Sequence, residues 1–194
     1  QAIPVLAEQA GHLTVFQRTP NYSIPARTKP MSAEYEREWK GNYQERREIM
    51  RHTRVGNFFD RSDLSATEVS EAERRKIYED RWAVGGTRFM SSFKDIATSQ
   101  AANDLTAEFV REKVRGIVKD PETAEILIAK DYPIGTKRIC ADSGYFETYN
   151  RDNVRLVDIN ASPIHEITPK GIRAGSEEHA FDAIVFATGF DAMT

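Results

Sequence analysis

The feature that most constrains the fold is a helix, a glycine and a strand at the start of the chain. Three apolar residues share one face of the predicted helix: Ile3, Leu6 and Ala7. Gly11 then ends the helix, and residues 12–17 (HLTVFQ) have the β-branched and aromatic content of a buried strand. A helix followed by such a strand is two-thirds of a βαβ unit, so the sequence predicts an α/β fold.

A basic residue stands at the end of this strand. In dinucleotide-binding folds the corresponding position, about 20 residues after a glycine loop, contacts the adenosine ribose. An acid there binds the 2′-hydroxyl of NAD, whereas an arginine pairs with the 2′-phosphate of NADP. Arg18 and the neighbouring Thr19 hydroxyl therefore favour NADPH over NADH. The alternative is that Arg18 is a solvated side chain at a strand end.

The middle of the chain, residues 28–130, is charged and helical in pattern. It contains two candidate capping boxes, Ser65 with Glu68 and Ser70 with Glu73. One apolar helical stripe is ended by a proline at position 121, and its members are Leu105, Phe109, Val110, Val114, Ile117 and Val118.

Residues 131–194 return to strand and turn patterns. Residues 153–159 (NVRLVDI) predict a strand, and two short strands are expected around a turn at Lys170 and Gly171. Residues 183–188 (AIVFAT) predict a buried strand. The expected organisation is one partial Rossmann-like domain, residues 1–27 and 131–194, with residues 28–130 inserted as a helical lobe.

Composition excludes several classes of function. A net charge of −3 and a pI near 5.9 do not provide the basic field of a nucleic-acid or membrane-surface binder. No apolar run reaches the roughly 18 residues of a membrane-spanning helix. The single cysteine, Cys140, is expected to be a buried or half-buried thiol in a cytoplasmic protein. The four histidines lack metal-ligand spacing, so we predict no metal.

Two further short stretches carry residues suited to chemistry. Lys137 and Arg138 follow a proline–glycine turn, where two cations can hold a phosphate or stabilise a developing anion. They can equally be ordinary surface residues. Thr188 and Gly189 end the predicted buried strand, and a glycine there lets the backbone approach a ligand or another domain closely.

Together these segments resemble the flavin-dependent Baeyer–Villiger monooxygenases, relatives of the cyclohexanone and phenylacetone enzymes. The resemblance rests on four segments in the family's order: LTVFQRTPNYSIPAR, YPIGTKR, YFETYNRDNVRLVD and IVFATGFDAMT. It implies an enzyme that uses FAD, NADPH and O2 to oxidise ketones to esters or lactones through a peroxyflavin.

The resemblance also implies roles for individual residues. Arg18, Thr19 and Lys137 would bind the 2′-phosphate of NADPH, and Arg138 would be the active-site arginine facing the flavin. Thr188 and Gly189 would pack near the cofactor as the chain returns toward an FAD domain.

The chain lacks the family's glycine loops and its fingerprint containing a His and a Trp, so we expect a segment of a larger enzyme that is inactive alone. Two alternatives remain open: a flavin monooxygenase that oxidises nitrogen or sulfur, and a non-catalytic helical interaction module.

Overall fold

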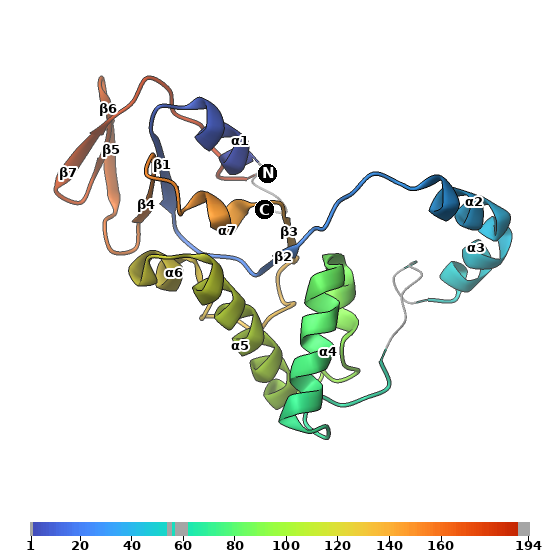
Figure 1. Ribbon diagram of the computed structural model, residues 1–194. Coiled ribbons are helices and arrows are strands. Elements are labelled where there is room, and N and C mark those ends of the chain that lie inside the picture. The colour runs from blue at the N-terminus through green and yellow to red at the C-terminus, as the bar shows by residue number, and fades with distance from the viewer. Residues whose placement is uncertain (1, 54–55, 57–61, 190–194) are drawn as a thin grey trace.

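The computed structural model describes residues 2–53, 56 and 62–189, and Figure 1 shows the arrangement of their elements. The helices are α1 (Ala2–Gln9), α2 (Ala33–Gly41), α3 (Tyr43–Arg51), α4 (Glu71–Val84), the 3₁₀ helix η1 (Gly86–Ser91), α5 (Gln100–Ile117), α6 (Pro121–Leu127) and α7 (Tyr145–Thr148). The strands are β1 (Leu13–Gln17), β2 (Ser23–Pro25), β3 (Cys140–Asp142), β4 (Val154–Asp158), β5 (Ile164–Thr168), β6 (Gly171–Ala174) and β7 (Glu177–Ala180).

Strands from the two ends of the chain pair with each other. β1 lies parallel to β4, from Leu13 opposite Val154 to Gln17 opposite Asp158. The Asn153 side chain, just before β4, donates to the carbonyl oxygens of Ala7 and Ala10 and so satisfies the C-terminal end of α1. The predicted helix–strand unit and the predicted strand at 153–159 are confirmed, and they form one parallel pair.

A second parallel pair marks where the chain leaves this region and where it returns. β2 pairs with β3, and the Ala26 N–H extends the pairing by donating to the Asp142 carbonyl. The segment between these strands holds α2 to α6 (Figure 1).

The C-terminal strands only partly match the prediction. β5 and β6 form the expected hairpin, and β7 adds a third antiparallel strand that was not predicted. The predicted buried strand at 183–188 is wrong. These residues form no strand, and Val185 and Phe186 are 70% and 69% exposed. A buried strand needs sheet neighbours, and none of the described strands pairs with this segment.

The helical region is built on an aromatic core. Tyr78 and Trp82 of α4 pack on Phe89 of η1 and Phe109 of α5, with ring centroids 5.0–6.0 Å apart. Of the apolar stripe predicted on α5, Phe109 and Val110 belong to this core and Val114 and Val118 to a second one, whereas Leu105 belongs to neither. That second core joins α5 and α6 to α7 and the β1–β4 pair, and its buried members are Val114, Val118, Ala124, Leu127, Ile128, Phe146 and Tyr149.

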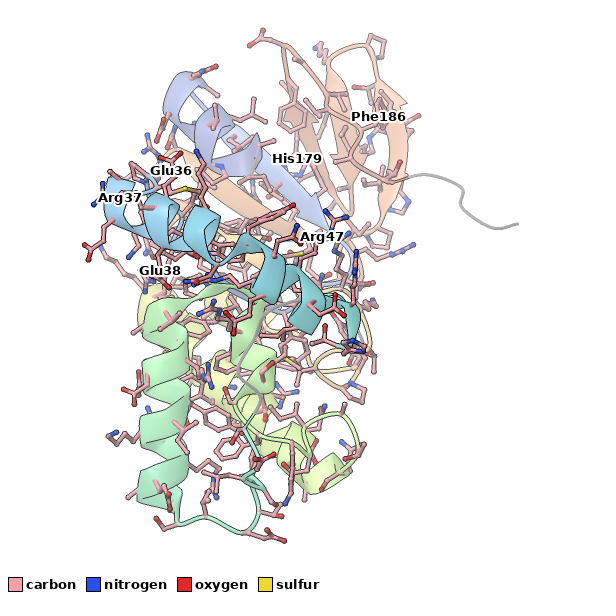
Figure 2. The ribbon with its side chains drawn as sticks, turned by 90° about the vertical axis from the view of Figure 1, so that its right-hand side faces the viewer. Glu36, Arg37, Glu38, Arg47, His179 and Phe186 are labelled. Carbon is pink, nitrogen blue, oxygen red and sulfur yellow. The ribbon has the colours of Figure 1, made fainter. Side chains whose placement is uncertain are left out.

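Only one of the two predicted capping boxes begins a helix. The Ser70 side chain accepts from the Glu73 N–H at the start of α4, as predicted. Ser65 caps no helix, because its hydroxyl donates to the Asp95 carboxylate at 2.7 Å and fixes a turn instead. Figure 2 shows α2 and α3 in front of the rest of the molecule, and neither helix has a buried residue.

Among residues 2–53, 56 and 62–189, none of the helices combines the length and the apolar character that crossing a bilayer requires.

Candidate functional site

The candidate site begins at the carboxyl end of β1. Arg18 and Thr19 follow the strand directly, and both are exposed. The Asn160 side chain, just after β4, donates to the Arg18 carbonyl oxygen and to the Asp158 carboxylate. Because β1 and β4 are parallel, both carboxyl ends lie at one edge, and Asn160 fixes the backbone of Arg18 there.

The Lys137–Arg138 turn lies against the same segment of chain. The Tyr132 hydroxyl lies 2.8 Å from the Pro20 carbonyl oxygen and 2.8 Å from Asn21 Oδ1, and it can donate its proton to either oxygen. In return Asn21 Nδ2 donates to the Arg138 carbonyl oxygen at 3.0 Å. Two turns that are about 110 residues apart in sequence are therefore joined by hydrogen bonds within three residues of Arg18.

Lys137 is oriented by an aromatic ring. Its Nζ lies 4.2 Å from the centroid of the Tyr132 ring, within the range of a cation–π contact. Burial raises the pKa of the Tyr132 hydroxyl, and the nearby Tyr22 hydroxyl raises it further. The hydroxyl therefore stays protonated and remains a hydrogen-bond donor at physiological pH.

The site has positive charge available for a ligand. Arg18, Lys137 and Arg138 are all exposed, and none of them forms an ion pair with a carboxylate in the described part of the chain. Unpaired guanidinium and ammonium groups on neighbouring turns are suited to bind a phosphate.

Thr188 and Gly189 are not brought into this group by any contact among the described residues. They lie in the extended segment after β7, both are exposed, and Gly189 has a φ of 85°. Residues 190–194, which complete the quoted motif, lie outside the described residues.

A pocket of about 680 Å³ lies elsewhere in the described part of the chain, and its lining residues include none of the predicted site residues. Its walls come from α4, α5, α7 and the β2 and β3 segments: Pro25, Arg27, Thr28, Arg75, Trp82, Glu112, Lys113, Gly116, Ile117, Asp142, Ser143, Gly144 and Glu147.

Sequence reasoning missed the residues that assemble the site. The joining contacts are made by Asn21, Tyr132 and Asn160. In the sequence, the only signal for Asn21 and Tyr132 was their position inside the quoted motifs.

The expectation for Cys140 was wrong, because its thiol is exposed. Cys140 is the first residue of β3, which has β2 as its strand partner, and its Sγ accepts from Asn21 Nδ2 at 3.2 Å.

A parallel strand pair with a cation directly after one of its carboxyl ends is typical of a nucleotide-binding α/β domain. The chain is similar to known enzymes over its whole length. It is 43% identical over 195 residues to a 2-oxo-Δ3-4,5,5-trimethylcyclopentenylacetyl-CoA monooxygenase of Pseudomonas putida. It is 40% identical over 196 residues to a cyclohexanone 1,2-monooxygenase of Acinetobacter, and 42% identical over 196 residues to a phenazine N-monooxygenase of Lysobacter antibioticus. In each case the match covers 100% of this chain and 36% of the relative.

Solved structures agree with this similarity. An oxidised steroid monooxygenase bound to NADP superposes with a TM-score of 0.94 at 50% identity, over 98% of this chain and 36% of that one. OTEMO in complex with FAD and NADP gives a TM-score of 0.94 at 42% identity, over 97% of this chain and 35% of that one. No family model matches the sequence.

The resemblance to the Baeyer–Villiger monooxygenases is thereby confirmed, and the chain spans a little over a third of the length of these relatives.

Proposed function

We propose that the protein containing this chain is an NADPH-dependent flavin monooxygenase that converts ketones to esters or lactones with O2. The chain supplies part of the NADPH site and the active-site arginine, and an FAD domain of the same protein supplies the flavin site. The observation that carries this proposal is the hydrogen-bonded junction between Pro20–Asn21 and Tyr132–Arg138, which brings unpaired cations to neighbouring turns.

The residues divide into two tasks. Arg18 and Thr19 bind the 2′-phosphate of NADPH, and Lys137 adds charge to the same phosphate. Arg138 serves the reaction itself, because a guanidinium remains protonated at any working pH and can stabilise negative charge that develops on a substrate oxygen. Thr188 and Gly189 let the backbone pack closely near the cofactor.

The described residues fit the phosphate of NADPH. The three cations lie exposed and without ion-pair partners among the described residues, as binding of a phosphorylated dinucleotide requires. When bound, FAD would supply the redox chemistry, with NADPH as the reductant and O2 as the oxidant. The composition, with its single cysteine, supports a reducing cytoplasm as the working location.

A second candidate function is oxidation of nitrogen. It is favoured by the 42% identity to the phenazine N-monooxygenase. Oxidation of an amine nitrogen develops no oxyanion for an arginine to stabilise, so the Arg138 turn favours the ketone reaction.

Substitution of Arg138 tests which reaction is catalysed. Arg138→Ala in the full-length enzyme should still consume NADPH but lose ester formation by about 100-fold or more, the size expected when one oxyanion-stabilising group is removed. The measurement is NADPH oxidation at 340 nm beside ester yield by gas chromatography. Ester formation at the normal rate would contradict the ketone assignment.

Substitution of Arg18 tests the cofactor. Arg18→Ala should raise KM for NADPH by about tenfold or more, because a charge-assisted contact to phosphate is lost, and should leave KM for NADH nearly unchanged. Steady-state kinetics with both cofactors provide the comparison. Equal changes for the two cofactors would argue against a 2′-phosphate contact.

A further inference from the structure

Tyr132 contacts both halves of the candidate site at once. Its hydroxyl binds the Pro20–Asn21 segment, and its ring supports the Lys137 ammonium at 4.2 Å from the centroid. Tyr132 therefore links the position of the Lys137 cation to the segment that follows Arg18.

The tyrosine is itself held in place from the other side. The Tyr22 ring meets it edge to face with centroids 5.6 Å apart, and the Tyr22 hydroxyl donates to the Tyr132 carbonyl oxygen at 3.4 Å. Tyr22 is in turn held by Arg111, whose guanidinium donates to the Tyr22 hydroxyl at 2.9 Å. These contacts connect Tyr132 to the buried aromatic core of the helical region, so its ring is a fixed support.

A fixed support matters because lysine is flexible. An exposed ammonium on a four-carbon stem samples many rotamers, and holding it over a ring reduces the entropy lost when it binds an anion. The hydroxyl does a second task, because it holds the backbone two residues after Arg18. One side chain thus acts on Lys137 and on the segment that follows Arg18, the two cations that the proposed function assigns to the phosphate.

We propose that Tyr132 is a positioning residue for cofactor selection, which holds Lys137 and the Arg18 segment in register for one 2′-phosphate. This inference rests on the proposed function, since it assigns Tyr132 to the same phosphate site. Tyr132 does not touch the cofactor in this proposal and acts through Lys137 and the Pro20–Asn21 backbone.

The experiment compares two substitutions in the full-length enzyme. Tyr132→Phe removes the hydroxyl and keeps the ring under Lys137, and Tyr132→Leu removes both. Calorimetry with NADP⁺ and NAD⁺ measures each dissociation constant. We expect Tyr132→Phe to weaken NADP⁺ binding about three- to tenfold, as for one lost hydrogen bond, with NAD⁺ binding changed less than about twofold. Tyr132→Leu should weaken NADP⁺ binding further, because the cation–π support is also lost.

Two controls separate positioning from general damage. Tyr78→Phe removes a buried hydroxyl that is bonded to Thr106 at 2.7 Å in the helical core, and it should leave both dissociation constants unchanged. In a Lys137→Ala background, Tyr132→Leu should weaken NADP⁺ binding no more than Tyr132→Phe does, since the ring then has no ammonium to support.

The outcomes are distinct. If Arg18→Ala and Lys137→Ala leave the preference for NADP⁺ over NAD⁺ intact, the proposed phosphate site is wrong and the role of Tyr132 is wrong with it. If those substitutions reduce the preference but both Tyr132 variants weaken the two cofactors equally, or not at all, the phosphate site stands and the positioning role is overturned. Should Tyr132→Leu not fold, the comparison of Tyr132→Phe with Tyr78→Phe decides between the same outcomes.

Discussion

Gly85 ends helix α4 at a place where a side chain has no room. Its φ is 75° and its ψ is −175°, a conformation that residues with a Cβ rarely adopt. A Cβ built there would lie 2.3 Å from the Pro25 carbonyl oxygen. Pro25 cannot easily move away, because it belongs to β2, which is paired with β3. The close approach of α4 to β2 therefore depends on this glycine.

Its neighbour provides a matched comparison. Gly86 also has a positive φ, 69°, but a Cβ there would meet nothing within 4 Å. We expect Gly86→Ala to lower the free energy of unfolding by about 1 kcal/mol, for the left-handed backbone alone. Gly85→Ala should cost about 3 kcal/mol or more, because the backbone clash adds to the same strain. Urea unfolding of both variants measures the difference, and equal losses would show that the clash is relieved.

The charged residues of the candidate site were chosen from the sequence, whereas the contacts that hold them came only from the fold. Arg18, Lys137 and Arg138 were singled out because a cation after a strand or a proline–glycine turn can bind a phosphate. Asn21 and Asn160 carry no comparable signal, because an asparagine after a proline or after a strand is ordinary turn chemistry. Their partners lie more than 100 residues away, and only the folded chain brings them together.

At the scale of elements, helix α5 holds the start of the Lys137 turn. Asn103, in the first turn of α5, is buried, and its amide donates to the carbonyl oxygens of Ile96 and Ile134 at 3.0 and 2.9 Å. Its Oδ1 accepts from the Ile134 N–H at 3.0 Å. Both backbone groups of Ile134, one residue before Gly135, thus depend on one side chain.

Removing that side chain should loosen the turn. Asn103→Ala leaves three buried backbone groups without partners, so we expect a loss of about 3 kcal/mol in the free energy of unfolding. Asp104→Ala, at the exposed neighbouring position of the same helix, should change it by less than about 0.5 kcal/mol. Thermal unfolding compares the two variants. Similar melting temperatures would show that water or a shifted backbone replaces the asparagine.

Elements with a strong hydrophobic periodicity were predicted correctly, whereas elements that depend on a neighbouring strand were not. The apolar stripe of α5 and the strands β1 and β4 follow from their patterns. β7, Glu177–Ala180, has a polar sequence and becomes a strand because β6 lies beside it. Residues 183–188 show the converse, since their apolar pattern fits a buried strand but no described strand pairs with them.

At the scale of the whole molecule, two parallel pairs close the chain around its helical region. β1 with β4 and β2 with β3 bring together residues more than 100 positions apart. Residues 182–189 have no part in this closure. They form no helix or strand, and the consecutive residues Val185 and Phe186 are both exposed.

Two adjacent, well-exposed apolar side chains on an unpaired backbone form a template for association. We expect this 194-residue chain to bind an apolar dye such as ANS and to self-associate, and the double substitution Val185→Ser with Phe186→Ser to reduce both. Ile167→Ser is the matched control, because Ile167 is 55% exposed but lies in β5, whose backbone is already paired with β6. Dye fluorescence and light scattering at several concentrations measure the effect. If the control and the double variant lower association equally, exposed apolar area alone would account for it, and the unpaired backbone of 183–188 would have no special role.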